Sequence, residues 1–185
     1  AATGGELIQP GTFWGPREVL VGQDGNIYVT DTGNKRIEKF TPEGIFLAQY
    51  GGAGVIQGRL DEPVGLAQDA EGNFYVADTW NMRVQKFDAD FNYVGQWPIN
   101  GWNSTSVVNK PYLVVDTVGT VYVSDPESYR ILVFDTNGLF KATFGQYGND
   151  SQSFALPNGL AVGPQGNLYV ADANNHRIMI FPPVR

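Results

Sequence analysis

The sequence predicts an all-β protein built from four copies of one structural unit. Four tyrosines are each separated by 47 residues along the 185-residue chain: Tyr28, Tyr75, Tyr122 and Tyr169. One glycine, one aspartate, one arginine and one phenylalanine recur at the same spacing in every unit. No segment shows helical periodicity of useful length. The 23 glycines indicate many tight turns between short strands.

Each unit is expected to contain four short strands. The first follows a repeated proline, as in Gly159–Val162, and the second is a β-branched and aromatic triplet such as Ile27–Val29. The third resembles Arg36–Phe40, and the fourth resembles Ile45–Tyr50. Four antiparallel strands in about 47 residues fit one blade of a β-propeller.

One unit carries a recognisable motif over residues 157–181. It reads Pro-x-Gly-Leu-Ala-Val-x-x-x-Gly-Asn-Leu-Tyr-Val-Ala-Asp-x-x-Asn-His-Arg-Ile-x-x-Phe and resembles the NHL repeat, with Asn175, His176 and Ile178 at the positions that name it. Residues 25–40 match as well, with Lys35 where histidine is usual. The resemblance covers essentially the whole chain and implies a β-propeller of NHL type. It says little about function.

We expect one domain, residues 1–185, with blades near 16–62, 63–110, 111–156 and 157–185. The last unit lacks a fourth strand, and residues 5–9 resemble the fourth strand of the first unit. The prediction is therefore a closed four-bladed ring, completed by the N-terminal strand. The alternative is a fragment of a six-bladed ring, which would expose two apolar blade faces and self-associate.

The aspartates and arginines of the repeat are interpreted as structural, because every blade needs its turn held in the same way, whereas a catalytic group is needed only once. They are Asp31, Arg36, Asp78, Arg83, Asp125, Arg130, Asp172 and Arg177.

Positions at which the repeats differ are the candidates for function. Directly after the repeated prolines, Arg17, Glu18, Tyr112 and Asn158 begin the strands that line a propeller channel. Polar and bulky side chains that converge at a channel mouth predict a small-ligand site. The alternative is that they plug a narrow axis.

A second set of differing residues lies in the turns and long loops expected at the same end of the propeller. It comprises Trp80, Met82, Trp102, Tyr129, Tyr147 and His176. Exposed aromatic residues with one methionine predict a binding face for a protein or a carbohydrate. Partial burial under the loops is the alternative.

Catalysis is disfavoured by the chain's chemistry. The single histidine, His176, belongs to the motif itself, and there is no cysteine. We therefore predict no catalytic residues and no metal or other cofactor. The alternative function is a metal-assisted lyase or lactonase, because some proteins with similar repeats are such enzymes. It would hold calcium or magnesium on the axis with Glu18, Asn158 and Asp116.

The net charge of the chain limits the classes of partner that we expect. Twelve lysines and arginines against nineteen aspartates and glutamates give a net charge of −7, which disfavours nucleic acid. No apolar run reaches the roughly 18 residues of a membrane span, so direct membrane insertion is not expected. The sequence favours a non-catalytic binding or scaffold module with a protein or carbohydrate partner. The composition and a start that looks processed favour a secreted or cell-surface location.

Overall fold

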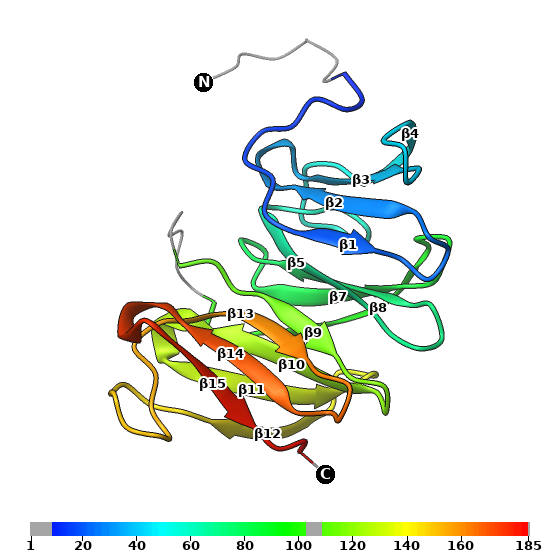
Figure 1. The fold of residues 1–185 in the computed structure, drawn as a ribbon. Helices are drawn as coiled ribbons and strands as arrows, with labels where there is room; N and C mark the ends of the chain where they lie inside the picture. The colour runs from blue at the N-terminus through cyan, green and yellow to red at the C-terminus, as the bar shows by residue number, and fades with distance from the viewer. Residues whose placement is uncertain (1–8, 103–108, 185) are drawn as a thin grey trace.

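The computed structural model describes residues 9–102 and 109–184, and these form four antiparallel sheets arranged as the blades of a propeller (Figure 1). Strands within each sheet follow chain order, from the innermost strand outward. The predicted all-β propeller of four repeats is confirmed. In the described part of the chain, no helix is long and apolar enough to cross a membrane.

Within the described residues, the first three blades have four strands each, and the last has three. The first blade contains β1 (Val19–Val21), β2 (Ile27–Asp31), β3 (Arg36–Phe40) and β4 (Phe46–Gly51). The second contains β5 (Pro63–Gln68), β6 (Phe74–Asp78), β7 (Arg83–Phe87) and β8 (Tyr93–Pro98). The third contains β9 (Leu113–Val115), β10 (Thr120–Asp125), β11 (Arg130–Asp135) and β12 (Phe140–Phe144). The fourth contains β13 (Pro157–Val162), β14 (Leu168–Asp172) and β15 (Arg177–Phe181).

The turn between the first and second strands of the second blade is held by an aspartate. Between β5 and β6, Asp69 Oδ1 accepts hydrogen bonds from the backbone N–H groups of Glu71 and Asn73. Gly72 follows with a φ of 90°, a conformation that glycine adopts without steric cost. This chemistry turns the chain back sharply and fixes the register of the two strands.

The turn between the second and third strands presents one residue of each blade outward. Three blades carry a short 3-10 helix here: η1 (Thr32–Asn34), η2 (Pro126–Ser128) and η3 (Ala173–Asn175). The residue that follows each turn has a left-handed backbone: Lys35, Met82, Tyr129 and His176, with φ between 52° and 58°. The fold therefore holds these four differing residues in one common backbone conformation.

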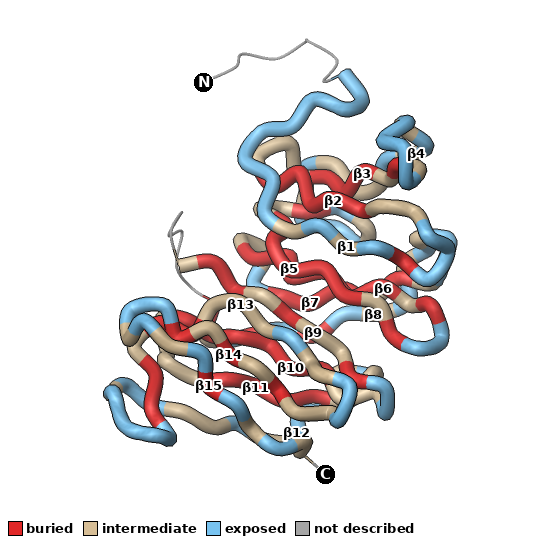
Figure 2. Tube along the Cα trace, viewed as in Figure 1, coloured by how far each residue is buried: buried red, intermediate tan, exposed pale blue. Residues whose placement is uncertain are grey.

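The core consists of three apolar clusters, one between each pair of neighbouring blades. Tyr28 and Ile37 of the first blade pack with Phe74 and Val76 of the second. Corresponding clusters join the second blade to the third and the third to the fourth. In Figure 2 the inner strands of the second and third blades are accordingly mainly buried. The blades are thus held together by large side chains that fill the space between sheets.

The blades follow one another along an arc. Close packing joins β5 to β1 and β2, β9 to β5, and β13 to β9 and β10, while the first and fourth blades lie at opposite ends (Figure 1). The predicted closing strand falls mainly on residues 5–8, which lie outside the described residues. Its described member, Gln9, lies beside the first blade, where its carbonyl accepts a hydrogen bond from Arg36 Nη2 at 3.2 Å.

Candidate functional site

The aspartates and arginines of the repeat form an ion pair within each blade. The arginine Nε lies between 2.7 and 2.9 Å from the aspartate Oδ2 in all four pairs: Arg36 with Asp31, Arg83 with Asp78, Arg130 with Asp125, and Arg177 with Asp172. The other oxygen of Asp78 accepts a hydrogen bond from the backbone N–H of Asp61, in the long loop before the proline. These contacts fasten the long loops to the blades.

The innermost strands bring together part of the predicted channel mouth. Glu18 is half-buried, and its carboxyl group accepts a hydrogen bond from the backbone N–H of Leu66 in the next blade. Burial raises the pKa of Glu18 to about 7, and that hydrogen bond only partly opposes the shift. Tyr112 is also half-buried, and its pKa is raised by burial and by the nearby Glu18, while Arg17 opposes the rise. Arg17, Glu18 and Tyr112 therefore interact electrostatically.

Asn158 is the second residue of β13, the innermost strand of the fourth blade. Its Oδ1 atom is buried and has no hydrogen-bond partner among the described residues. A buried oxygen of this kind carries a cost in free energy unless a donor reaches it.

The ligands of the alternative calcium or magnesium site do not all come together. Asp116 lies at the far end of β9 from Tyr112, where its Oδ1 accepts hydrogen bonds from the backbone N–H groups of Val118 and Thr120. Within residues 9–102 and 109–184, no group of three or more His, Cys, Asp or Glu side chains is placed to hold a metal ion.

The aromatic residues predicted for the binding face divide into two groups. Trp102 is only 4% exposed, packs in the core between the second and third blades, and donates from Nε1 to the carbonyl of Ser124 at 3.1 Å. Trp80 is half-buried, with the ammonium groups of Lys110 and Lys35 at 5.1 and 5.9 Å from its ring centre. Trp102 is therefore a core residue, because the long loop folds it inward.

The remaining predicted residues of this face reach solvent. Met82 and His176 are exposed, and Tyr147 is 72% exposed. Tyr147 packs edge-on against Tyr129 with ring centres 4.9 Å apart. We call the end of the propeller formed by residues 32–35, 79–82, 126–129 and 173–176, together with the described parts of the long loops before the prolines, the turn face.

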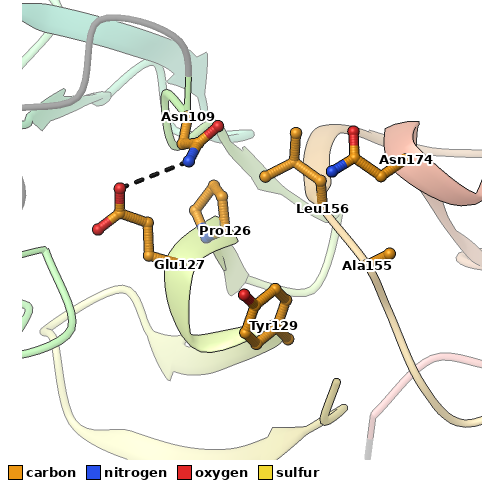
Figure 3. Close-up of a pocket in the computed structure, with 7 residues that line it drawn as sticks. All are labelled: Asn109, Pro126, Glu127, Tyr129, Ala155, Leu156 and Asn174. Carbon is orange, nitrogen blue, oxygen red and sulfur yellow. Dashed lines mark hydrogen bonds between the residues drawn. The ribbon is translucent and has the colours of Figure 1, made fainter. Parts of the chain in front are cut away.

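The turn face contains a pocket of about 280 Å³ between the third and fourth blades (Figure 3). Its lining residues are Asn109, Pro126, Glu127, Tyr129, Ala155, Leu156 and Asn174. Asn109 Nδ2 donates to Glu127 Oε1 at 3.5 Å on one side of the pocket, and Asn174 lies on the other side. The pocket continues as a narrow crevice toward the second blade, where Thr79 and Trp102 contribute to its wall.

Glu127 gives the pocket its charge. Among the described residues, no lysine, arginine or histidine forms an ion pair with it. The pocket therefore combines one carboxylate, two side-chain amides and the tyrosine ring of Tyr129. Such a set accepts hydrogen bonds and attracts a cation.

Of the residues that line this pocket, only Tyr129 was predicted from the sequence to belong to a binding site. A signal for Glu127 and Asn174 was present, because they occupy the position at which the other blades carry Gly33 and Trp80. No feature of the sequence pointed to Asn109, because it lies in a loop outside the regular part of the repeat, where the four units cannot be compared position by position. The pocket arises from the way two blades meet, which the spacing of one repeat does not describe.

Comparison with known families identifies three of the four units. Residues 13–40, 60–87 and 154–181 match the NHL repeat. No curated protein has a significant match to the sequence.

Several solved structures share the fold at low sequence identity. A chain of a nidogen/laminin complex is 22% identical, with a TM-score of 0.67, and the match covers 91% of this chain and 60% of that one. A catalytically inactive virginiamycin B lyase from Staphylococcus aureus, solved with quinupristin, is 14% identical, with a TM-score of 0.65 and coverages of 97% and 59%. A luciferin-regenerating enzyme is 16% identical, with a TM-score of 0.61 and coverages of 88% and 55%. The chain thus spans less than two thirds of the length of these structures, and proteins that bind partners and proteins that are enzymes share its fold.

Proposed function

Since this chain is a β-propeller of NHL repeats, we propose that it is a non-catalytic binding module whose turn face binds a protein partner. The partner inserts a lysine or arginine side chain into the pocket between the third and fourth blades. The observation that carries the proposal is the Glu127 carboxylate beside the Tyr129 ring in that pocket. This carboxylate accepts a hydrogen bond from Asn109 but forms no ion pair with any described residue.

The pocket has room for one long side chain. Its volume of about 280 Å³ is close to the lower end of the range of about 300–1,000 Å³ that is usual for small-molecule sites. A lysine or arginine side chain can enter it while the partner's backbone stays outside on the turn face. The preference for such a side chain over a metabolite rests on the chemistry of the lining.

The chemistry of the lining favours a cation. Glu127 supplies a carboxylate, and Tyr129 supplies an aromatic face within the same pocket. A guanidinium or ammonium group can pair with the first and lie over the second. The protein's net charge of −7 would also attract a basic partner over a longer range.

The exposed aromatic residue beside the pocket supports a macromolecular partner. Tyr147 is 72% exposed and contacts Tyr129, so it extends the pocket into a wider apolar surface. Interfaces between proteins commonly centre on such aromatic anchors, with polar residues around them. The fold of this chain is also shared by a chain in a protein complex, that of nidogen and laminin.

The proposal is tested by panning a random peptide library against the immobilised protein. We expect the selected peptides to share a lysine or arginine, and to bind the Glu127→Gln variant about fivefold to tenfold more weakly. Glu71→Gln is the matched control, because Glu71 is an exposed acid in the turn between β5 and β6. Selection of peptides without a basic residue, or equal binding by the variant, would contradict the proposal. A carbohydrate array probed in parallel would contradict it if neutral glycans bind and peptides do not.

A second candidate function rests on Glu18. A carboxyl group with a pKa of about 7 can both donate and accept a proton near neutral pH, which suits general acid–base catalysis at the channel mouth. The virginiamycin B lyase and the luciferin-regenerating enzyme share the fold. A lyase or lactonase activity that is lost in Glu18→Gln would support this alternative, with or without added calcium or magnesium.

A further inference from the structure

A second pocket, of about 140 Å³, lies between the second and third blades. Lys86 of β7 and Trp97 of β8 line it from the second blade, and Thr136 and Asn137 line it from the third. Thr136 follows the last residue of β11, whereas the turn face lies at the other end of that strand, before Arg130. The pocket is therefore separate from the turn face, and a site here would act independently of the proposed function.

The charge of Lys86 distinguishes this pocket. Within residues 9–102 and 109–184, the other four lysines each form an ion pair, and Lys86 forms none. Its ammonium group donates to the carbonyl of Thr136 at 3.2 Å and lies 5.4 Å from the centre of the Tyr75 ring. Because Lys86 is half-buried, water screens its charge only in part. The pocket thus holds a cation with space for an anion beside it.

The equivalent lysine of the first blade shows what Lys86 is missing. Lys39 Nζ lies 2.9 Å from Asp24 Oδ2. In the second blade Glu71 takes the position of Asp24, and its carboxylate accepts a hydrogen bond from Asn73 Nδ2 at 3.4 Å. A lysine at this position of the blade pairs with a carboxylate when one is in reach. For Lys86, the described part of the chain supplies none.

Trp97 brings a second unused donor to the pocket. It is only 6% exposed, and its Nε1 atom is buried with no hydrogen-bond partner among the described residues. An indole N–H group can only donate. A buried donor without an acceptor carries a cost in free energy. An acceptor that enters the pocket and reaches this group would remove the cost.

Two glycines leave space around Trp97. The indole packs directly against Gly138, where an added Cβ atom would lie 2.5 Å from the ring. In the interface between the first two blades the equivalent residues are Tyr50 and Phe91, whose rings stack with centres 4.1 Å apart. The second interface therefore holds one aromatic ring of this pair where the first holds two. On the wall formed by β8, a Cβ atom added to Gly95 would meet no neighbour within 4 Å.

We propose that this pocket binds a carboxylate group, which forms an ion pair with Lys86 Nζ and accepts a hydrogen bond from Trp97 Nε1. A carboxylate has two acceptor oxygens, one for each donor. The side-chain amides of Gln96 and Asn137 line the same pocket and add further donors. The volume of about 140 Å³ suits a carboxylate with a few carbon atoms. This group belongs either to a small free acid or to a side chain or chain end of another molecule.

The proposal is tested first with sodium acetate, followed through the indole N–H signals in proton–nitrogen NMR spectra. The chain has four tryptophans, and the signal that is lost in Trp97→Phe belongs to Trp97. Acetate should move this signal downfield, because the N–H group gains an acceptor, and the shift should saturate. Sodium chloride at the same ionic strength should leave it in place. A Trp97 signal that does not respond to acetate, or that chloride moves as far, would overturn the proposal.

Lys86→Gln tests the ion pair. Acetate should bind this variant about tenfold more weakly, because a neutral amide replaces the ammonium group. Lys141→Gln is the matched control, since Lys141 is an exposed lysine of β12 that pairs with Asp135. This control should bind acetate like the unmodified chain. Equal weakening in the two variants would reveal a general attraction of anions and would rule out the site.

Gly95→Leu covers the case in which Lys86→Gln disturbs folding. The variant keeps both donors and fills the pocket from a wall where the new side chain has room. Its melting temperature should not fall, while the saturable acetate shift should disappear. A folded Gly95→Leu protein that binds acetate as tightly as the unmodified chain would show that the carboxylate binds elsewhere.

Short peptides distinguish the two sources of the carboxylate. A tripeptide with a free C-terminal carboxylate is compared with acetate and with the same tripeptide as its C-terminal amide. Binding of the free-acid peptide at least tenfold more tightly than acetate would support the proposal and identify a partner's carboxylate as the ligand. Weaker or equal binding would support it with a small free acid as the ligand. Displacement of acetate by the amide would contradict the proposal.

Discussion

Arg83 Nε donates a hydrogen bond to Asp78 Oδ2 at 2.7 Å, and the carboxylate of Asp78 is completely buried. The other donors of Arg83 reach Gln96 Oε1 and the carbonyl groups of Val55, Ile56 and Arg59 in the long loop before the second blade. One ion pair thus joins a turn, a strand and a loop. Its repetition in every blade marks it as part of the scaffold, while the residues that differ form the pocket.

Removing this arginine should strongly destabilise the protein. Arg83→Ala leaves the Asp78 carboxylate buried without its cation, which costs about 3–5 kcal/mol of unfolding free energy. Arg177→Ala should cost less, because the side chain of Arg177 is 28% exposed and water can partly replace it. Urea unfolding of both variants measures the difference. Equal and small losses would show that the ion pairs are not structural.

Glu18 should make stability depend on pH between about 4.5 and 7. Its pKa rises from 4.5 to about 7 on folding because of burial, so the folded state holds the proton more tightly than the unfolded state. The stabilisation is complete below pH 4.5 and is lost as pH rises through 7, by roughly 3 kcal/mol at most. Glu18→Gln should remove this dependence and be the more stable protein at pH 8. Urea unfolding at pH 5 and pH 8 tests this, and parallel pH profiles would contradict it.

Replacing Trp102 with alanine should lower the free energy of unfolding much more than replacing Tyr147 with alanine. Trp102→Ala creates a cavity between two blades and leaves the Ser124 carbonyl without its donor, at a cost of about 3–5 kcal/mol. Tyr147→Ala removes an exposed ring and should change stability by less than about 0.5 kcal/mol. Thermal unfolding distinguishes them. A similar melting temperature for the two variants would mean that Trp102 is not a core residue.

The residue after each 3-10 turn should tolerate glycine better than a β-branched residue. His176 has a φ of 53° and an exposed side chain. His176→Gly relieves backbone strain there, whereas His176→Val increases it, so the two variants should differ by about 1–2 kcal/mol. Chemical unfolding gives this difference directly. A valine variant as stable as the glycine variant would be the contrary result.

The repeat allowed much of the fold to be predicted from the sequence. Regular spacing predicted four repeats, and the β-branched and aromatic triplets indicated the second strand of each one. The path of the long loops was not predictable in the same way. Trp102 was predicted for the binding face, with partial burial under the loops as the alternative, and its loop folds it into the core beside Ser124. Loop residues lack the periodicity on which such predictions depend.

The candidate site was only partly predictable from the sequence, because it forms between two blades. Tyr129 was predicted for the binding face because it stands where the repeats differ, and Glu127 occupies another such position although it was not predicted for the site. That they share a pocket with Leu156 depends on the packing of the third blade against the fourth. Sequence spacing describes one blade at a time, so a site formed between blades emerges only from the structure.

The most direct test of the proposed binding function is the dissociation constant of one selected basic peptide, measured by isothermal titration calorimetry. We expect Glu127→Gln to weaken binding of this peptide about fivefold to tenfold and Glu71→Gln to leave it unchanged. When the peptide's lysine or arginine is replaced with glutamine, the unmodified chain and Glu127→Gln should bind the peptide equally well. If both protein variants bind the basic peptide as tightly as the unmodified chain, the pocket between the third and fourth blades is not the binding site.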